Sequence, residues 1–194
     1  MAIMDGQATL FYDLTDPLSY LLDQELVVVE QDLGISVRRT GFELLPPPSP
    51  LLDAHDAFWA GRWASAEVLG GLQGSSLVQP QLVPWTRKAH ELHLHAKALE
   101  AGETVRKAIF AAFFAEARDI GRVDTLVEIA ADAGLDRTEA KAVLDVDRFQ
   151  ADVVDARQAA LVAGVRDTPS LLAGRTSLQG FHNRIALSTL LAGT

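Results

Sequence analysis

The chain has 194 residues, of which 48% are hydrophobic and 22% charged, and its 17 basic and 26 acidic residues give a formal charge of −9. This length and apolar fraction suit a globular domain with its own core and exclude a disordered chain, while the acidic balance argues against binding nucleic acid or an anionic membrane. Because the chain has no cysteine, it cannot form disulfides, thiolate nucleophiles, iron–sulfur clusters or cysteine-bound zinc sites.

The first residues and the apolar stretches carry no targeting signal. Residues 1–6 have neither the basic start nor the long apolar run of a signal peptide. The longest apolar run, residues 108–115, is far shorter than the roughly 18 residues of a membrane-spanning helix. We therefore expect a soluble, cytoplasmic protein.

The N-terminal part predicts a strand, a helix and a second strand. Residues 8–13 have the character of a short buried strand, and Asp16 followed by Pro17 is typical of a helix start. A helix is expected over residues 18–32, because its leucines and valines recur at helical spacing before a glycine. Residues 35–43 alternate and predict a second strand, which completes a right-handed βαβ unit.

A proline run at residues 46–50 marks the boundary to a mostly helical stretch. Pro84 is expected to open one of its helices, and Thr104, Asp136 and Asp147 are expected to cap others. The helices are predicted over residues 51–69, 84–102, 104–118, 123–133, 136–144 and 147–164, and a glycine-rich loop is predicted at 70–76.

Aromatic and histidine residues in this stretch suggest packing before function. Trp59 and Trp63 lie one helical turn apart and are expected in the core, with a pocket wall or a dimer contact as alternatives. His90, His93 and His95 lack the i, i+4 spacing of a helical zinc motif. We expect them to be surface or packing residues, and no metal site is predicted.

The last thirty residues predict a hairpin and a helix. Strands are expected at residues 170–173 and 176–179, joined by a Gly174-Arg175 turn. Asn183 is expected to cap a final helix over residues 184–191.

Three segments resemble the DsbA-like branch of the thioredoxin fold: Phe11–Tyr20, residues 113–121 with 133–136, and Gly164–Pro169. This branch includes FrnE-type oxidoreductases, 2-hydroxychromene-2-carboxylate isomerases and kappa-class glutathione transferases. The resemblance implies an α/β, thioredoxin-like domain that is discontinuous in sequence. It would comprise residues 1–45 and 155–194, with an all-helical insertion over residues 46–154.

The resemblance places the chemistry at the start of the first helix. FrnE-type members have Cys-Pro-x-Cys there and the glutathione-using branches have Ser-Pro-x-Ser, whereas this chain has Asp16-Pro17-Leu18-Ser19. Thiol–disulfide exchange needs a thiolate, so it is excluded. A carboxylate at position 16 accepts hydrogen bonds and repels a thiolate, which leaves Ser19 as the surviving hydroxyl. We favour Asp16 as a helix cap and Asp13 as a strand end over a paired general acid.

The resemblance also implies a ligand groove. Thr168-Pro169 resembles the family's cis-proline loop, whose backbone edge pairs with a peptide or a glutathione-like ligand. Tyr12 is a further implied ligand-binding residue. His182-Asn183 stands where the family's Ser-Asp holds the γ-glutamyl end, with the acid replaced by an amide.

Three functions stay open. The first is a DsbA-family protein without redox activity that binds a small molecule or peptide between the first helix and Pro169. The second is a glutathione-dependent isomerase or transferase that uses Ser19, with Asp16 beside it and glutathione as cofactor. The third is a structural or oligomeric protein, such as a homodimer, with Trp59 and Trp63 at its interface.

Overall fold

The computed structural model describes residues 8–53, 55–75 and 77–193, so the predictions for residues 1–6 lie outside it. Its main sheet has the strand order β2-β1-β5-β6. The strands are β1 (Thr9–Tyr12), β2 (Arg38–Gly41), β5 (Ser170–Ala173) and β6 (Thr176–Gln179). β1 pairs parallel with β2 and antiparallel with β5, which pairs antiparallel with β6. This mixed α/β arrangement confirms the predicted thioredoxin-like fold.

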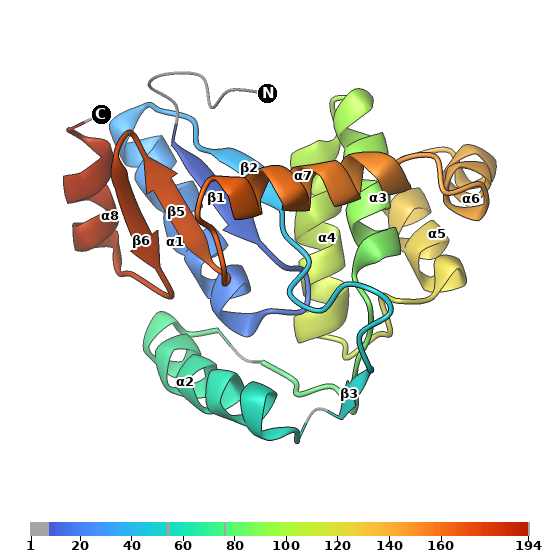
Figure 1. The fold of residues 1–194 in the computed structure, drawn as a ribbon, viewed down its shortest axis with the longest axis horizontal. Helices are drawn as coiled ribbons and strands as arrows, with labels where there is room; N and C mark the ends of the chain where they lie inside the picture. Colours follow the sequence, from blue (N-terminus) through green and yellow to red (C-terminus); the bar gives the residue numbers. More distant parts are fainter. Residues whose placement is uncertain (1–7, 54, 76, 194) are drawn as a thin grey trace.

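Helices cover both faces of the sheet (Figure 1). α1 (Pro17–Leu33) and α8 (Arg184–Leu191) pack together behind it, and α7 (Gln150–Val162) crosses in front. Along β1, Leu10 and Tyr12 join the main core, whereas Phe11 packs with residues of the α7 side, because successive strand residues face opposite ways.

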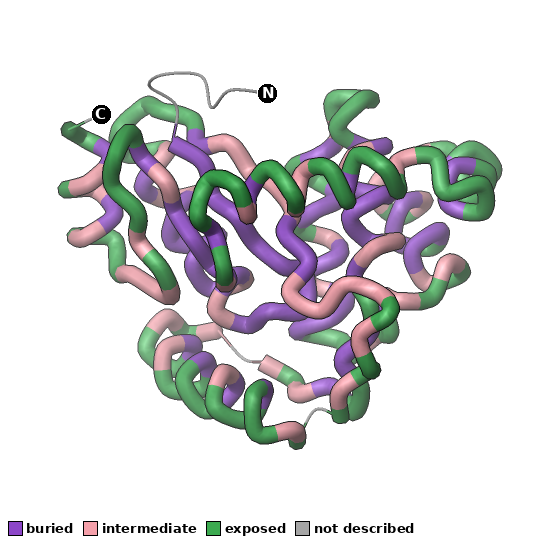
Figure 2. The backbone as a smooth tube through the Cα atoms, viewed as in Figure 1, coloured by how far each residue is buried: buried purple, intermediate pink, exposed green. Residues whose placement is uncertain are grey.

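Four of the remaining helices form a second region beside the sheet. They are α3 (Arg87–Ala98), α4 (Gly102–Phe114), α5 (Val123–Asp132) and α6 (Arg137–Asp145). Figure 2 shows buried backbone continuing from β1 and β5 into α3 and α4, so one main core joins the two regions. α7 runs unbroken through the predicted boundary at residues 154/155.

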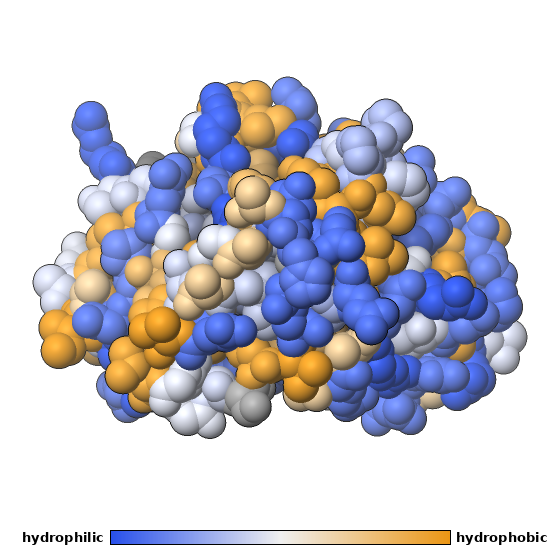
Figure 3. Space-filling model, turned by 90° about the horizontal axis from the view of Figure 1, so that it is seen from below, coloured by the Kyte–Doolittle hydropathy of each residue, from blue (hydrophilic) through white to orange (hydrophobic). Residues whose placement is uncertain are grey.

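α2 (Ala57–Gln73) lies apart from the other helices of the predicted insertion and packs against α1. A two-stranded ribbon of β3 (Leu52–Asp53) and β4 (Leu82–Val83) brings together the segments on either side of it. Figure 3 shows this face of the molecule, where hydrophobic side chains are interrupted by hydrophilic ones. Trp59 and Trp63 are buried, as expected for core residues, and do not form an exposed aromatic patch.

Several predicted boundaries are wrong for reasons of packing. α2 continues through Gly70 to Gln73, where a loop was expected, because Gly70 lets the helix lie against Leu21 and the turn that follows. It starts at Ala57 with Asp56 as its N-cap, since Leu52 and Asp53 form β3. The second strand is shorter than predicted, spanning Arg38–Gly41.

Three helix starts also differ from the prediction. α3 begins at Arg87 and not at Pro84, because the chain first completes β4. α4 begins at Gly102, so Thr104 lies inside the helix and does not cap it. Asp147 has a φ of 54° in the turn after α6, and α7 begins three residues later. The expected caps at Asp136, which accepts from the Glu139 amide, and at Asn183 are confirmed.

Within the described residues, no helix is both long and apolar enough to span a membrane.

Candidate functional site

Asp16 lies where β1 has ended and α1 begins, and it caps that helix. Its carboxylate accepts hydrogen bonds from the backbone amides of Leu18 (3.3 Å) and Ser19 (3.1 Å). Pro17 occupies the first helical position, where no amide hydrogen is needed. The predicted capping role is therefore confirmed, and the helix amides favour negative charge at this point.

Three side chains complete the surroundings of this carboxylate. The Ser19 hydroxyl donates to it at 2.6 Å, the Thr168 hydroxyl at 3.0 Å and Nη1 of Arg62 at 2.9 Å. Asp16 and Ser19 are fully inaccessible and Thr168 is 2% exposed. The structure thus brings together Asp16, Ser19 and Thr168, as the resemblance implied, and closes them off with a residue from α2.

Arg62 is a functional candidate that was not predicted from the sequence. Besides Asp16, its Nη1 donates to the backbone carbonyl of Thr168 at 2.8 Å, and its Nη2 contacts the Asp167 carboxylate. The guanidinium lies 4.9 Å from the ring centroid of Phe58, close enough for a cation–π contact. The sequence signal that could have pointed to Arg62 is that it is the single charged residue among the first ten of α2.

The loop before Pro169 therefore has no open backbone edge at Thr168. The Thr168-Pro169 bond is cis, as predicted. The Thr168 carbonyl accepts a hydrogen bond from Arg62, and the Thr168 amide donates to the Asp167 side chain at 2.9 Å. The backbone groups of Thr168, at which the resemblance implies that a ligand pairs, are therefore bonded to side chains of this protein.

Burial raises the pKa of Asp16 from 3.8 to about 6, although Arg62 and the hydroxyls of Ser19 and Thr168 act in the opposite direction. At pH 7 the side chain is mostly ionised and can only accept hydrogen bonds. The Ser19 hydroxyl hydrogen is consequently committed to Asp16. A ligand that needs this hydroxyl as a donor must first break that bond.

The other predicted ligand-binding residues lie in different surroundings. The Tyr12 hydroxyl is buried in the core and bonded to Nδ1 of His93 at 2.7 Å. His182 contacts the Gln179 carbonyl at 3.0 Å, while Asn183 caps α8. His182 and Asn183 line a cavity of about 440 Å³ between α2 and α8, to which Glu25 of α1 contributes a carboxylate.

Asp13 does not pair with Asp16. One of its oxygens accepts from the Leu44 amide at 2.6 Å, and the other lies 3.6 Å from Nε2 of His90. His90, His93 and His95 are all buried, so none of the three histidines of α3 is a surface residue. In the described ranges, no group of three or more histidine or acidic residues has the arrangement of a metal site.

A family model for the DSBA-like thioredoxin domain matches residues 7–187. The chain belongs to this family. Among curated relatives, YwbO of Bacillus subtilis is 31% identical over 157 residues, covering 75% of this DSBA-like chain and 76% of YwbO.

Solved structures share the DSBA-like fold at low sequence identity. SCO1869 of Streptomyces coelicolor, named a probable DsbA oxidoreductase, has a TM-score of 0.86 and 19% identity over 97% of this chain and 89% of its own. A 2-hydroxychromene-2-carboxylate isomerase has a TM-score of 0.78 and 18% identity over 96% and 93%. The cytosolic disulfide reductase DsbM of Pseudomonas aeruginosa, solved with GSH, has a TM-score of 0.72 and 18% identity. The match covers 96% of this chain and 96% of DsbM. The present DSBA-like chain has no cysteine, so it has no thiolate for disulfide exchange.

Proposed function

We propose that this DSBA-like protein is a binding protein without thiol redox activity. Its ligand, a small molecule or a peptide, would enter between the start of α1 and the loop before Pro169 and displace Arg62. The observation that carries this proposal is the Arg62 bond to the Thr168 carbonyl. The Thr168 carbonyl of this loop is bonded to the side chain of Arg62, which comes from a separate helix. Because a side chain can move, a ligand could take its place.

The displaced groups define the chemistry of the ligand. An amide N–H on the ligand would replace Arg62 at the Thr168 carbonyl, and a carboxylate on the ligand would pair with the released guanidinium. A peptide with a free carboxylate, such as glutathione, has both groups. Its thiol would gain nothing from Asp16, because an ionised carboxylate repels a thiolate and donates no hydrogen bond.

Calorimetric titration with reduced glutathione and with S-methylglutathione tests this proposal. We expect both to bind with similar affinity, since the thiol makes no favourable contact. Arg62→Ala should weaken binding about tenfold or more, because the loss of the ion pair with the ligand carboxylate outweighs the removal of the side chain that covers the Thr168 carbonyl. Arg157→Ala is the matched control, because Arg157 also donates to a backbone carbonyl, that of Glu43. Absence of binding at 10 mM of either peptide would refute the proposal.

A glutathione-dependent isomerase or transferase is the second candidate. The observation in its favour is Glu25, which supplies a carboxylate in the cavity beside His182 and Asn183. The resemblance expects an acid there for the ligand amine, although Glu25 also pairs with Arg184. The isomerase and the GSH-bound DsbM among the similar structures support it as well.

This second function requires the Ser19 hydroxyl to turn from Asp16 toward a thiol. Conjugation of glutathione to 1-chloro-2,4-dinitrobenzene should then exceed the uncatalysed rate and be lost in Ser19→Ala. Ser65→Ala is the control, since the Ser65 hydroxyl is exposed and donates to the Gly61 carbonyl within α2. A rate equal to the uncatalysed one would refute the transferase function, and the binding function would be the one that stays.

Two further expectations accompany the proposal. The first is a cytoplasmic location, since DsbM is named a cytosolic protein, and cell fractionation tests it. We also expect a homodimer, for which Val68 and Leu72 of α2 are 67% and 82% exposed. Light scattering of the wild type and of Leu72→Asp tests the dimer.

A further inference from the structure

Two adjoining cavities lie along β2, the edge strand of the sheet. One, of about 410 Å³, lies between β2 and the ends of α3 and α4 that face it, and the other, of about 430 Å³, between β2, α3 and α7. Their shared lining residues are Arg38, Arg39, His93 and Lys97. Each is within the range of small-molecule sites, roughly 300–1,000 Å³. Neither is lined by Asp16 or by the side chains that bond to it.

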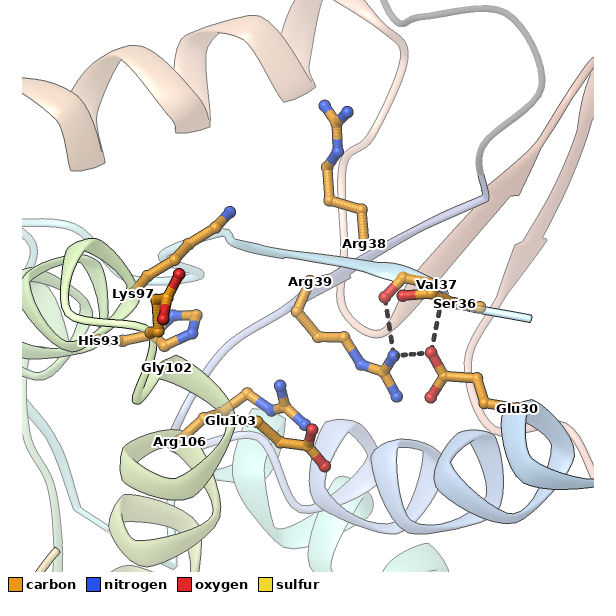
Figure 4. A pocket seen from close by; sticks show the side chains of 11 residues that line it. Glu30, Ser36, Val37, Arg38, Arg39, His93, Lys97, Gly102, Glu103 and Arg106 are labelled. Atoms are coloured by element: carbon orange, nitrogen blue, oxygen red, sulfur yellow. Dashed lines mark hydrogen bonds and ion pairs between the residues drawn. The ribbon is translucent and has the colours of Figure 1, made fainter. Parts of the chain in front are cut away.

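The first cavity collects cationic hydrogen-bond donors (Figure 4). Arg39 lies between Glu30 and Arg106 and is bonded to Glu30 and Asp23, but its buried Nη2 has no hydrogen-bond partner among the described residues. Arg106 shares the Asp23 carboxylate with it. Lys97 is exposed at the end of α3 and forms no ion pair in the described part of the chain.

His93 adds a neutral donor to this group. Burial and the positive charges of Arg106 and Lys97 lower the pKa of His93 to about 3, so the ring is uncharged at pH 7. The Tyr12 hydroxyl is bonded to Nδ1 at 2.7 Å and has no other acceptor in the described structure. We assign the tautomer in which the hydroxyl donates to Nδ1 and the ring hydrogen lies on Nε2, because this tautomer gives the hydroxyl hydrogen an acceptor among the described residues.

Carboxylates also line this cavity, but two of the three are already engaged. Glu30 accepts from Arg39 and the Val37 amide, and Glu103 pairs with Lys107 one turn away on α4. Glu100 lies exposed on the turn after α3. The four cationic side chains that line the cavity thus outnumber its three carboxylates.

The second cavity has mainly apolar walls. Leu94 of α3 and Val153 and Ala156 of α7 line it, and so does Gly41 of β2. The glycine is required there, since an added Cβ would lie 2.4 Å from Nδ1 of His90. An apolar chamber therefore adjoins a chamber of donors along the same strand.

We propose that these two cavities together bind an amphipathic monocarboxylate. Its apolar tail lies between α3 and α7, against Leu94 and Ala156. Its carboxylate accepts hydrogen bonds from Nε2 of His93 and Nζ of Lys97, and it brings negative charge beside Nη2 of Arg39. This site goes beyond the function proposed above and does not depend on it.

Octanoate is the probe, with octanamide as its uncharged counterpart and acetate as its counterpart without a tail. Calorimetric titration of the full-length protein should show octanoate binding about tenfold or more tighter than either. The same affinity for octanoate is expected in the presence of glutathione. The two sites can therefore fail or succeed independently.

Three variants locate the ligand, each at a position that is not fully buried. Lys97→Ala should weaken octanoate binding about tenfold by removing a charged donor, and Ala156→Leu should weaken it by filling the apolar chamber. Glu100→Gln should tighten it about twofold, because a like charge is removed. Lys141→Ala, on the exposed side of α6, is the matched control.

Equal affinity for octanoate and octanamide would overturn the proposal, because the hydrogen-bond donors would then not bind the carboxylate. Unchanged affinity in both Lys97→Ala and Ala156→Leu would also overturn it, because the ligand would lie elsewhere. If Ala156→Leu abolishes octanoate binding, Lys97→Ala leaves it unchanged and octanamide does not bind, the apolar chamber is supported. The role of Lys97 is then refuted. Circular dichroism of each variant confirms that it is folded.

Discussion

Asp16 should make the protein more stable in mild acid, against the usual trend for carboxylates. Burial raises its pKa to about 6, whereas the unfolded chain titrates near 3.8. Between these values the folded state binds more protons than the unfolded state, so stability falls as the pH rises through the window and is largest below it. Asp16→Asn removes this titration and keeps a good capping residue.

The size of the effect follows from the two pKa values. A shift from 3.8 to about 6 corresponds to about 3 kcal/mol in full. Between pH 7 and pH 4 it amounts to about 2 kcal/mol, because at pH 4 the carboxyl of the unfolded chain is already partly protonated. The wild type should therefore gain about this much relative to Asp16→Asn over that range. Other carboxylates titrate in both proteins and cancel in the difference.

Urea unfolding at pH 4, 5, 6 and 7, followed by the fluorescence of the buried tryptophans, measures this difference. A difference that stays flat across the range would show that Asp16 titrates alike in both states. A difference of opposite sign, with the wild type gaining as the pH rises, would show that Arg62 and the hydroxyls outweigh burial. Either result would refute the balance of forces inferred for Asp16.

Three further substitutions test the packing around the site and the sheet. Arg62→Ala should lower the free energy of unfolding by about 3 kcal/mol at pH 7, because the Asp16 carboxylate stays buried without its ion-pair partner, and urea unfolding should show a smaller loss at pH 5. Gly41→Ala should cost about 1–3 kcal/mol, because its Cβ would meet the His90 ring; an unchanged Tm would show that the ring moves away freely. Asn183→Ala should cost about 1 kcal/mol by removing the cap of α8, while Asn183→Asp, compared by urea unfolding, should keep most of the stability.

Elements that depend on local signals agree with the prediction from sequence. β5 and β6 match it residue for residue, because the turn between them needs a positive φ that Gly174 adopts at 58°. The Asp16 cap follows in the same way from an aspartate before a proline. Such features involve a few neighbouring residues and can be recognised without knowing the fold.

Features that depend on distant contacts could not be predicted in this way. The length of α2 is set partly by the contact of Gly70 with α1, and a glycine pair otherwise indicates a loop. Arg62 meets Asp16 and Thr168 across 46 and 106 residues of sequence. Only the folded arrangement of α2 over the sheet end brings these groups together.

The closure by Arg62 also has a kinetic consequence. A ligand that uses the Thr168 carbonyl can bind only to molecules in which Arg62 has withdrawn, so its apparent affinity is reduced by the fraction of such molecules. If withdrawal precedes binding, the association rate levels off at the rate of opening as ligand is added. Changes on α2 that never touch the ligand would then alter how fast and how tightly it binds.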